Sequence, residues 1–151
     1  MPLVWCDPRS ACKAARPPGD HSPAASPGFA GDGGPARNAR FRSIACIALD
    51  GQGNLLISDS EDRRVRRIQR QTGVITTFAG NGERGFPTDG QAATSAPLSA
   101  PDGLAVDAST GSVYIADGVV LRVSPSGTVQ RFFGSAFISS YGRGLSIDPA
   151  R

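Results

Sequence analysis

The residue types that usually carry catalysis are scarce in this chain of 151 residues. His21 is the single histidine, so there is no Ser-His-Asp or Cys-His arrangement and no histidine-ligated metal site. The three cysteines, Cys6, Cys12 and Cys46, have neither the even count of a disulfide framework nor the paired spacing of a zinc site. Cys46 lies in an apolar run and is expected to be a small buried residue. We therefore expect a protein that is not an enzyme and has no cofactor or bound metal.

The strongest charge feature is a basic run made up of Arg63, Arg64, Arg66, Arg67 and Arg70. Clustered arginines give salt-dependent affinity for nucleic acids, so RNA binding is one hypothesis for this run. In a β-strand, however, alternate side chains point to opposite faces, and no aromatic residues for base stacking are interleaved here. The favoured interpretation is a solvated outer strand, with RNA binding and a protein partner as alternatives.

Aspartates recur at matching places along the chain. Asp50, Asp107 and Asp148 each end a short apolar run, and Asp59 and Asp117 each follow the next such run. A ring of these carboxylates would suit a cation. The favoured interpretation is that each accepts backbone N–H bonds in the turn after it, because its short side chain suits that geometry.

The segment 80–85 matches the glycine pattern G-x-G-x-x-G of dinucleotide sites. That mechanism needs a helix to open at the same point, so that its N-terminus faces the pyrophosphate. Pro87 and Gly90 follow instead and break any helix. These glycines are predicted to be turn residues.

Short β-prone runs separated by turn residues fill the rest of the chain. The first group of predicted strands is 44–49, 55–58, 65–70 and 74–79; the second is 103–107, 113–116, 119–123 and 128–133. The short connections within each group predict antiparallel meanders. The first strand of the first group is wholly apolar, which predicts that it is the most buried strand of its sheet.

The two groups repeat each other at a distance of 57 residues. Gly28-Phe29 is matched by Gly85-Phe86, and the run 47–50 is matched by 104–107; a third copy starts at Gly144. Four-stranded meanders in tandem are typical of the blades of a β-propeller. The connection 81–101, which matches 29–43, is longer than the roughly 14 Å across three strand spacings requires. We expect the surplus to fold over one face of the array.

The domain organisation follows from this pattern. Residues 1–27 lack periodicity and are rich in Pro, Ala, Ser and Gly, so a disordered N-terminal tail is predicted. Residues 28–151 are predicted to form a partial propeller. Blade one spans about 43–80, blade two about 102–134, and the start of a third spans 143–151.

Two segments of the first copy resemble the NHL repeat family of propellers. The segment 53–59 is similar to the family's Gly-Asn-Leu-Tyr-Ile-Ala-Asp, and 62–68 is similar to its Asn-His-Arg-Ile-Arg-Lys-Val. The Gly-rich segment 28–36 is similar to an inter-blade loop of the family. The second copy keeps Tyr114-Ile115-Ala116-Asp117 but has no equivalent of Asn-His-Arg, so a pairing of Asp59 with Arg64 has no counterpart there.

The resemblance implies an all-β fold: a partial, open β-propeller of four-stranded antiparallel blades, of the NHL, six-bladed type. Members of the family mostly bind proteins, some bind single-stranded RNA, and a few carry a lyase or hydrolase site. Two blades and one strand do not close a ring. The chain is therefore expected to be a fragment of a longer propeller, or to self-associate and complete the ring.

The resulting hypothesis is a non-catalytic NHL-repeat scaffold that binds a protein partner through its inter-blade loops. RNA binding through 63–70 is the alternative, and a remnant of a propeller lyase or hydrolase is the second alternative. The candidate interaction surface consists of Phe29, Asp32, Arg63, Arg64, Arg66, Phe86 and Asp89. With no apolar run long enough for a membrane and no secretory signal, a cytoplasmic location is predicted.

Overall fold

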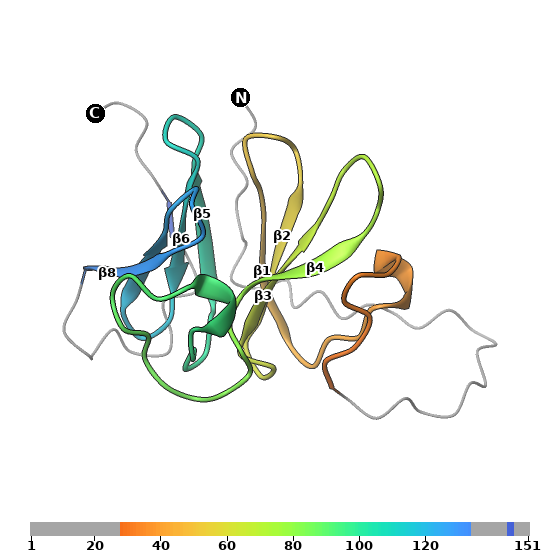
Figure 1. The fold of residues 1–151 in the computed structure, drawn as a ribbon. Helices are drawn as coiled ribbons and strands as arrows, with labels where there is room; N and C mark the ends of the chain where they lie inside the picture. Colours follow the sequence, from red (N-terminus) through yellow and green to blue (C-terminus); the bar gives the residue numbers. More distant parts are fainter. Residues whose placement is uncertain (1–27, 134–144, 147–151) are drawn as a thin grey trace.

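Two four-stranded antiparallel sheets make up the protein, as seen in a computed structural model that describes residues 28–133 and 145–146 (Figure 1). The first sheet has the order β1-β2-β3-β4 and the second β5-β6-β7-β8. The strands are β1 Ile44–Leu49, β2 Leu55–Asp59, β3 Arg64–Ile68, β4 Ile75–Ala79, β5 Gly103–Asp107, β6 Ser112–Ala116, β7 Val120–Val123 and β8 Val129–Phe133. The predicted tail 1–27 and nearly all of the predicted third copy lie outside the described residues.

Turn chemistry sets the ends of the strands. In the turn after β1, Asp50 accepts hydrogen bonds from the backbone N–H groups of Gln52 and Asn54, both at 2.9 Å. Gly53 in the same turn has φ 80°, a left-handed conformation that glycine adopts without steric cost. The strand predicted as 65–70 ends earlier, at Ile68, because Gln69 already closes the next turn with Val74 and Gly73.

Strand β1 is not the most buried strand of its sheet, so that prediction is wrong. Ile44, Ile47 and Leu49 are all exposed, whereas four of the five residues of β2 are buried. A wholly apolar strand is typical of a strand that is covered on both faces. In the structure β1 is an edge strand, and one of its faces meets no second sheet among the described residues.

Each sheet has two faces, which follow from the strand register. We call the trailing face of the first sheet the one that carries Cys46, Ala48 and Val65, and the leading face the one that carries Ile47, Leu49 and Ile57. In the second sheet the leading face carries the residues at equivalent positions, Leu104, Val106 and Ile115. Its trailing face carries Ala105 and Tyr114.

The core lies where the trailing face of the first sheet meets the leading face of the second. Its buried side chains from the first sheet are Cys46, Ala48, Leu56, Val65 and Ala79. Those from the second sheet and the turn before β7 are Leu104, Val113, Ile115, Val119, Leu121, Val123 and Val129. Cys46 is thus a small buried core residue, as the sequence predicts.

Two equivalent loops precede the sheets, and each contains a short 3-10 helix. We call residues 28–43, with η1 Ala36–Asn38, the first wedge loop, and residues 85–100, with η2 Ala93–Ser95, the second wedge loop. Each loop bridges to the outer edge of the sheet that follows it, through Pro35 with Val74 and Ala92 with Thr128. The second wedge loop also reaches the core through Ala93, Ala96 and Leu98.

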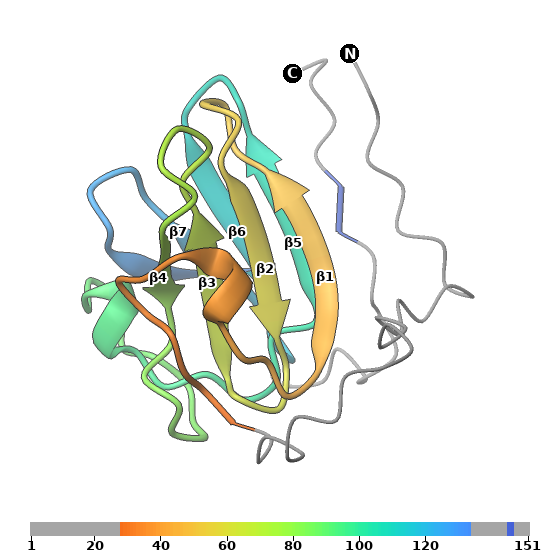
Figure 2. The same ribbon diagram turned by 90° about the vertical axis from the view of Figure 1, so that its right-hand side faces the viewer.

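The surplus of the long connections therefore fills space beside the sheets. In Figure 1 the second wedge loop lies between the two sheets, and Figure 2 shows the first wedge loop crossing in front of the outer strands of the first sheet. An unpaired edge strand is a template for aggregation, and both loops cover part of such an edge. We expected the surplus of each long connection to fold over one face of the array. This expectation is correct only in part, because each wedge loop also covers part of the outer edge of its sheet.

Candidate interaction surface

Four of the seven candidate residues come together where the first wedge loop meets β3. The guanidinium carbon of Arg64 lies 4.0 Å from the centre of the Phe29 ring, and that of Arg66 lies 4.6 Å from it. Arg66 also forms an ion pair with Asp32, with 2.5 Å between the nitrogen and the carboxylate oxygen. Asp32 in turn accepts hydrogen bonds from the backbone N–H and the hydroxyl of Thr77 in β4. This cluster fastens the loop to the sheet.

Arg66 is not a surface residue, so its place in the predicted interaction surface is wrong. Only 1% of it is exposed, and its guanidinium donates to the carbonyls of Ala30 and Arg40 at 3.4 and 3.5 Å. The interpretation of β3 as a solvated outer strand also fails, because β3 lies between β2 and β4. The basic run therefore presents no continuous face for phosphate groups, and RNA binding receives no support from it.

The other arginines of the run have separate environments. Arg64 is partly buried and donates to the carbonyls of Asp62 and Asn81 at 3.1 and 2.6 Å. Arg63 sits in the turn before β3 with φ 52°, and its buried Nε has no hydrogen-bond partner among the described residues. Arg67 lies over the ring of Phe78 at 5.8 Å.

Phe86 and Asp89 belong to the second wedge loop and lie apart from the arginine cluster. Asp89 accepts a hydrogen bond from the backbone N–H of Arg131 in β8 at 2.7 Å. It therefore holds its loop to an outer strand, as Asp32 does in the first sheet. Phe86 is 47% exposed, so an aromatic ring stands in solvent at this loop.

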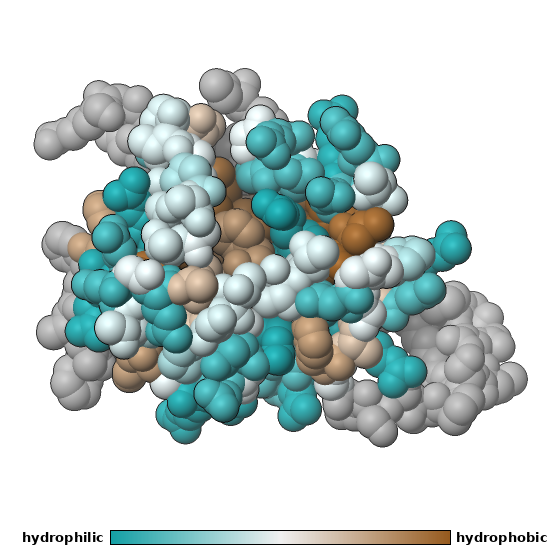
Figure 3. All heavy atoms as spheres, viewed as in Figure 1, coloured by the Kyte–Doolittle hydropathy of each residue, from teal (hydrophilic) through white to brown (hydrophobic). Residues whose placement is uncertain are grey.

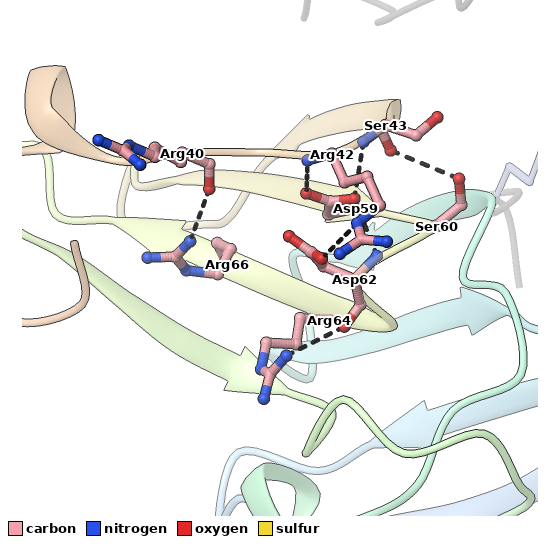
Figure 4. A network of polar contacts seen from close by, with 8 residues as sticks. All are labelled: Arg40, Arg42, Ser43, Asp59, Ser60, Asp62, Arg64 and Arg66. Atoms are coloured by element: carbon pink, nitrogen blue, oxygen red, sulfur yellow. Dashed lines mark hydrogen bonds and ion pairs between the residues drawn. The ribbon is translucent and has the colours of Figure 1, made fainter. Parts of the chain in front are cut away.

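A partly buried polar network joins the start of β1 to the turn after β2 (Figure 4). Asp59 accepts hydrogen bonds from the backbone N–H groups of Arg42 and Ser43, at 2.7 and 2.9 Å. The side chain of Arg42 pairs with Asp62 at 3.1 Å. Burial raises the pKa of Asp62, and the charge of Asp59 raises it further, while Arg42 and Arg64 lower it.

Asp117 of the second sheet accepts a pair of hydrogen bonds equivalent to those of Asp59. It accepts hydrogen bonds from the backbone N–H groups of Ser99 and Ala100, which lie 57 residues after Arg42 and Ser43. Burial raises its pKa to about 6, the hydrogen bonds from Ser99 and Ala100 oppose this, and the charge of Asp102 adds to it.

The predicted role of the aspartates holds for Asp50 and Asp107, holds in part for Asp59, and fails for Asp117. Asp50 and Asp107 accept backbone N–H bonds in the turns that follow them. These bonds and the hydroxyls of Ser109 and Thr110 lower the pKa of Asp107 to about 2, the hydroxyls contributing most. Asp117 accepts from residues far before it, while Asp59 does both. Asp148 lies outside the described residues.

Metal-ligand groups and long apolar helices were also sought in the part of the chain that the structure describes. Within residues 28–133 and 145–146, no three His, Cys, Asp or Glu side chains are grouped to hold a metal ion. No helix in these ranges is long and apolar enough to cross a membrane. Gly80 and Gly82 have φ 93° and 91° and lie in the connection after β4, as turn residues do.

Of the exposed apolar side chains, sequence reasoning selected Phe29 and Phe86 and missed the others. In the space-filling view, patches of apolar surface lie between hydrophilic loops (Figure 3). The large apolar side chains that are exposed among the described residues are Phe29, Ile44, Ile47, Leu49, Phe86 and Phe132. A sequence signal for this surface is present in the repeat, because apolar residues recur at positions 47 and 104 and at positions 49 and 106.

Teneurins are among the known proteins with similar sequences. The chain is 35% identical to Teneurin-3 of Danio rerio and 33% identical to Teneurin-3 of Mus musculus, in each case over 109 residues and 64% of the chain. Teneurin-4 of Mus musculus is 33% identical over the same length. The chain spans only about 4% of the length of these relatives.

No protein-family model matches the chain. Among solved structures, a structural genomics protein of unknown function from Bacteroides thetaiotaomicron is similar with a TM-score of 0.45 and 25% sequence identity. That similarity covers 52% of this chain and 20% of the other.

Proposed function

We propose that the chain is part of an NHL-type propeller, of the six-bladed kind, that serves as a non-catalytic protein-binding module. Blade one spans about 43–80, blade two about 102–134, and a third begins at about 143. The observation that carries the proposal is the wedge packing of two sheets related by a 57-residue repeat, with a loop inserted between them.

The interaction surface we favour is narrower than the one expected from the sequence. Asp32, Asp89 and Arg66 are engaged in holding the loops to the sheets. Phe86 remains as an aromatic side chain that is 47% exposed on a loop anchored at both ends. Exposed aromatic anchors on rigid elements are typical of binding hot spots, because they bury much area at a small entropic cost. The cytoplasmic location stays a prediction.

Site-specific photocrosslinking tests this proposal. Phe86 is replaced by a photoreactive phenylalanine analogue, and the matched control carries the same analogue at Thr72, an exposed residue of the β3–β4 turn. We expect a discrete protein adduct at position 86 that is absent at position 72 and insensitive to ribonuclease. The protein in the adduct is then purified, and Phe86→Ser should weaken its binding by tenfold or more, as expected for a hot spot of about 1.4 kcal/mol or more.

Two results would contradict the protein-binding function. One is the same set of adducts at positions 86 and 72, which would indicate random contact. The other is an adduct that ribonuclease removes, which would favour nucleic acid as the ligand.

A further inference from the structure

Exposed apolar side chains gather on two separate faces of the molecule. Ile47 and Leu49, on the leading face of the first sheet, are 44% and 51% exposed. Phe132, in β8 of the second sheet, is 55% exposed. Such side chains usually mark an interface when they lie together on an ordered surface. The repeat shows what each of these faces is built to contact.

The leading face has a covered counterpart in the second sheet. Leu104 and Val106 stand 57 residues after Ile47 and Leu49; Leu104 is buried, and Val106 packs against the core. The wedge loops show the same contrast, since Phe41 is half-buried and its equivalent Leu98 is fully buried. The covering element in the second copy is the trailing face of the first sheet. The leading face of the first sheet thus has the composition of a sheet-to-sheet contact without a sheet on it.

The trailing face shows the reverse contrast. Phe78 lies at a register shift between β3 and β4 and packs against the core. Phe132 lies at the same register shift between β7 and β8, but its ring is exposed and meets Tyr114 edge-on, with 4.9 Å between ring centres. The trailing face is therefore covered in the first sheet and accessible at Phe132 in the second.

Hydrogen bonds at the internal contact extend the comparison. The first sheet donates the N–H groups of Gly80 and Asn81 to the carbonyls of Ala93 and Ala96, at 2.9 and 3.0 Å. The equivalent carbonyls on the first wedge loop belong to Ala36 and Ala39. Among the described residues, neither accepts a hydrogen bond from a sheet. The first wedge loop therefore offers acceptors in the arrangement that the second one uses.

We propose that a second copy of this chain seats the trailing face of its second sheet on the leading face of the first sheet. The contact between copies then repeats the contact that the two sheets make within one chain. One copy supplies Phe132 and its neighbours, and the other supplies Ile47 and Leu49. A second copy is the occupant because the chain exposes apolar side chains on one face of each kind, Ile47 and Leu49 on the leading face and Phe132 on the trailing face. The internal contact shows that these two kinds of face fit each other. Such a head-to-tail contact leaves one face of each kind free at the ends of a dimer.

The assembly is separate from the Phe86 loop, so this inference and the protein-binding function are able to fail independently. The test is sedimentation velocity of the full chain over a wide range of concentration. We expect the wild-type mass to rise above the monomer value of 15.6 kDa as concentration increases. Ile47→Asp and Phe132→Asp should each remain monomeric, while the control Phe86→Ser should assemble like the wild type.

Mixing the two variants gives the sharpest result. Ile47→Asp keeps an intact trailing face and Phe132→Asp keeps an intact leading face, so an equimolar mixture should form dimers, with twice the monomer mass, and nothing larger. Both side chains are about half exposed, and unchanged circular dichroism and melting would confirm that the fold is intact. If either variant is misfolded, Leu49→Gln and Tyr114→Ser replace Ile47→Asp and Phe132→Asp.

Three outcomes would overturn the proposal. The first is a wild-type chain that stays monomeric at every concentration. The second is an assembly that Ile47→Asp abolishes and Phe132→Asp leaves intact, which indicates a symmetric contact between two leading faces. The third is a mixture of the two folded variants that remains monomeric.

Discussion

The two sheets share one backbone plan but hold their wedge loops with different chemistry. In the first sheet the loop is held by Arg66, which pairs with Asp32 and lies beside Phe29. In the second sheet the position of Arg66 is taken by Leu121, which is fully buried in the core together with Leu98 of the loop. An ion pair and an aromatic ring hold the wedge loop in the first copy, and aliphatic packing holds it in the second.

This difference shows that the element packed over a position determines which side chain is stable there. Leu121 lies under a whole sheet, where a charge would be far from water. Arg66 lies under a loop only, and that loop supplies a carboxylate and two carbonyls to its guanidinium. An arginine is therefore compatible with the first sheet at a position where the second sheet needs an apolar residue.

The largest test of this comparison exchanges the two side chains. Leu121→Arg places a charge in the core without a partner, and we expect it to lower the free energy of unfolding by about 4 kcal/mol or more. The control Arg66→Leu should cost less, about 2 kcal/mol, because the Asp32 carboxylate that loses its partner is 32% exposed to water and keeps its hydrogen bonds from Thr77. Urea denaturation followed by circular dichroism measures both. Equal losses for the two variants would refute the difference between the sheets.

A second pair of variants compares the loops. Leu98→Ala removes a fully buried side chain from the second wedge loop, and we expect a loss of about 3 kcal/mol in the free energy of unfolding. Phe41→Ala, at the equivalent position of the first loop, should cost about 1 kcal/mol, because that side chain is only partly buried. Thermal denaturation of both variants checks the ranking. A Phe41→Ala loss as large as that of Leu98→Ala would show that the first loop is packed as tightly as the second.

A pH titration tests the aspartates with a raised pKa at the entry of each sheet, Asp62 beside Arg42 and Asp117 beside Asp102. The pKa of Asp117 is raised from 3.8 to about 6, mainly by burial, so the folded protein binds more protons than the unfolded chain between these values. Its contribution to stability is thus present below pH 3.8 and lost as pH rises to about 6. The loss is at most about 3 kcal/mol.

Denaturation in urea at several pH values between 4 and 7 measures this slope. Asp117→Asn should flatten it, and Asp102→Asn should reduce it, because the charge of Asp102 raises the pKa of Asp117. Asp62, whose pKa is also raised, contributes in the same direction and leaves a smaller residual slope. An unchanged slope in Asp117→Asn would exclude Asp117 as its origin.

Much of the fold was predictable, because its signals are local. Periodic apolar runs and turns such as 50–54 placed all eight strands to within two residues, and the 57-residue echo predicted two equivalent sheets. The burial of β1 was not predictable in the same way. Its apolar sequence is suited to a covered face, but whether a sheet covers that face depends on tertiary packing, which the sequence of the strand does not contain.

The candidate site shows the same division. The sequence predicts residues of the two Gly-rich loops as an interaction surface, but it does not predict the contacts that these residues make. An exposed aspartate in a Gly-rich loop suggests binding. In the structure, however, Asp32 and Asp89 accept hydrogen bonds from backbone N–H groups that lie 45 and 42 residues later in the sequence. Long-range partners of this kind become visible only when the outer strands are in place.

The smallest expected effect separates these two aspartates. Asp32 holds the N–H and hydroxyl of Thr77 and also pairs with Arg66, whereas Asp89 holds only the N–H of Arg131 among the bonds described. We expect Asp32→Asn to lower the local free energy of opening by about 1 to 2 kcal/mol, and Asp89→Asn by about 0.5 to 1 kcal/mol. Amide hydrogen exchange at residues 77 and 131 measures each site in turn. If Asp89→Asn accelerates exchange as much as Asp32→Asn does, the ion pair with Arg66 adds nothing to the first loop, and the chemical contrast between the two copies has no energetic consequence there.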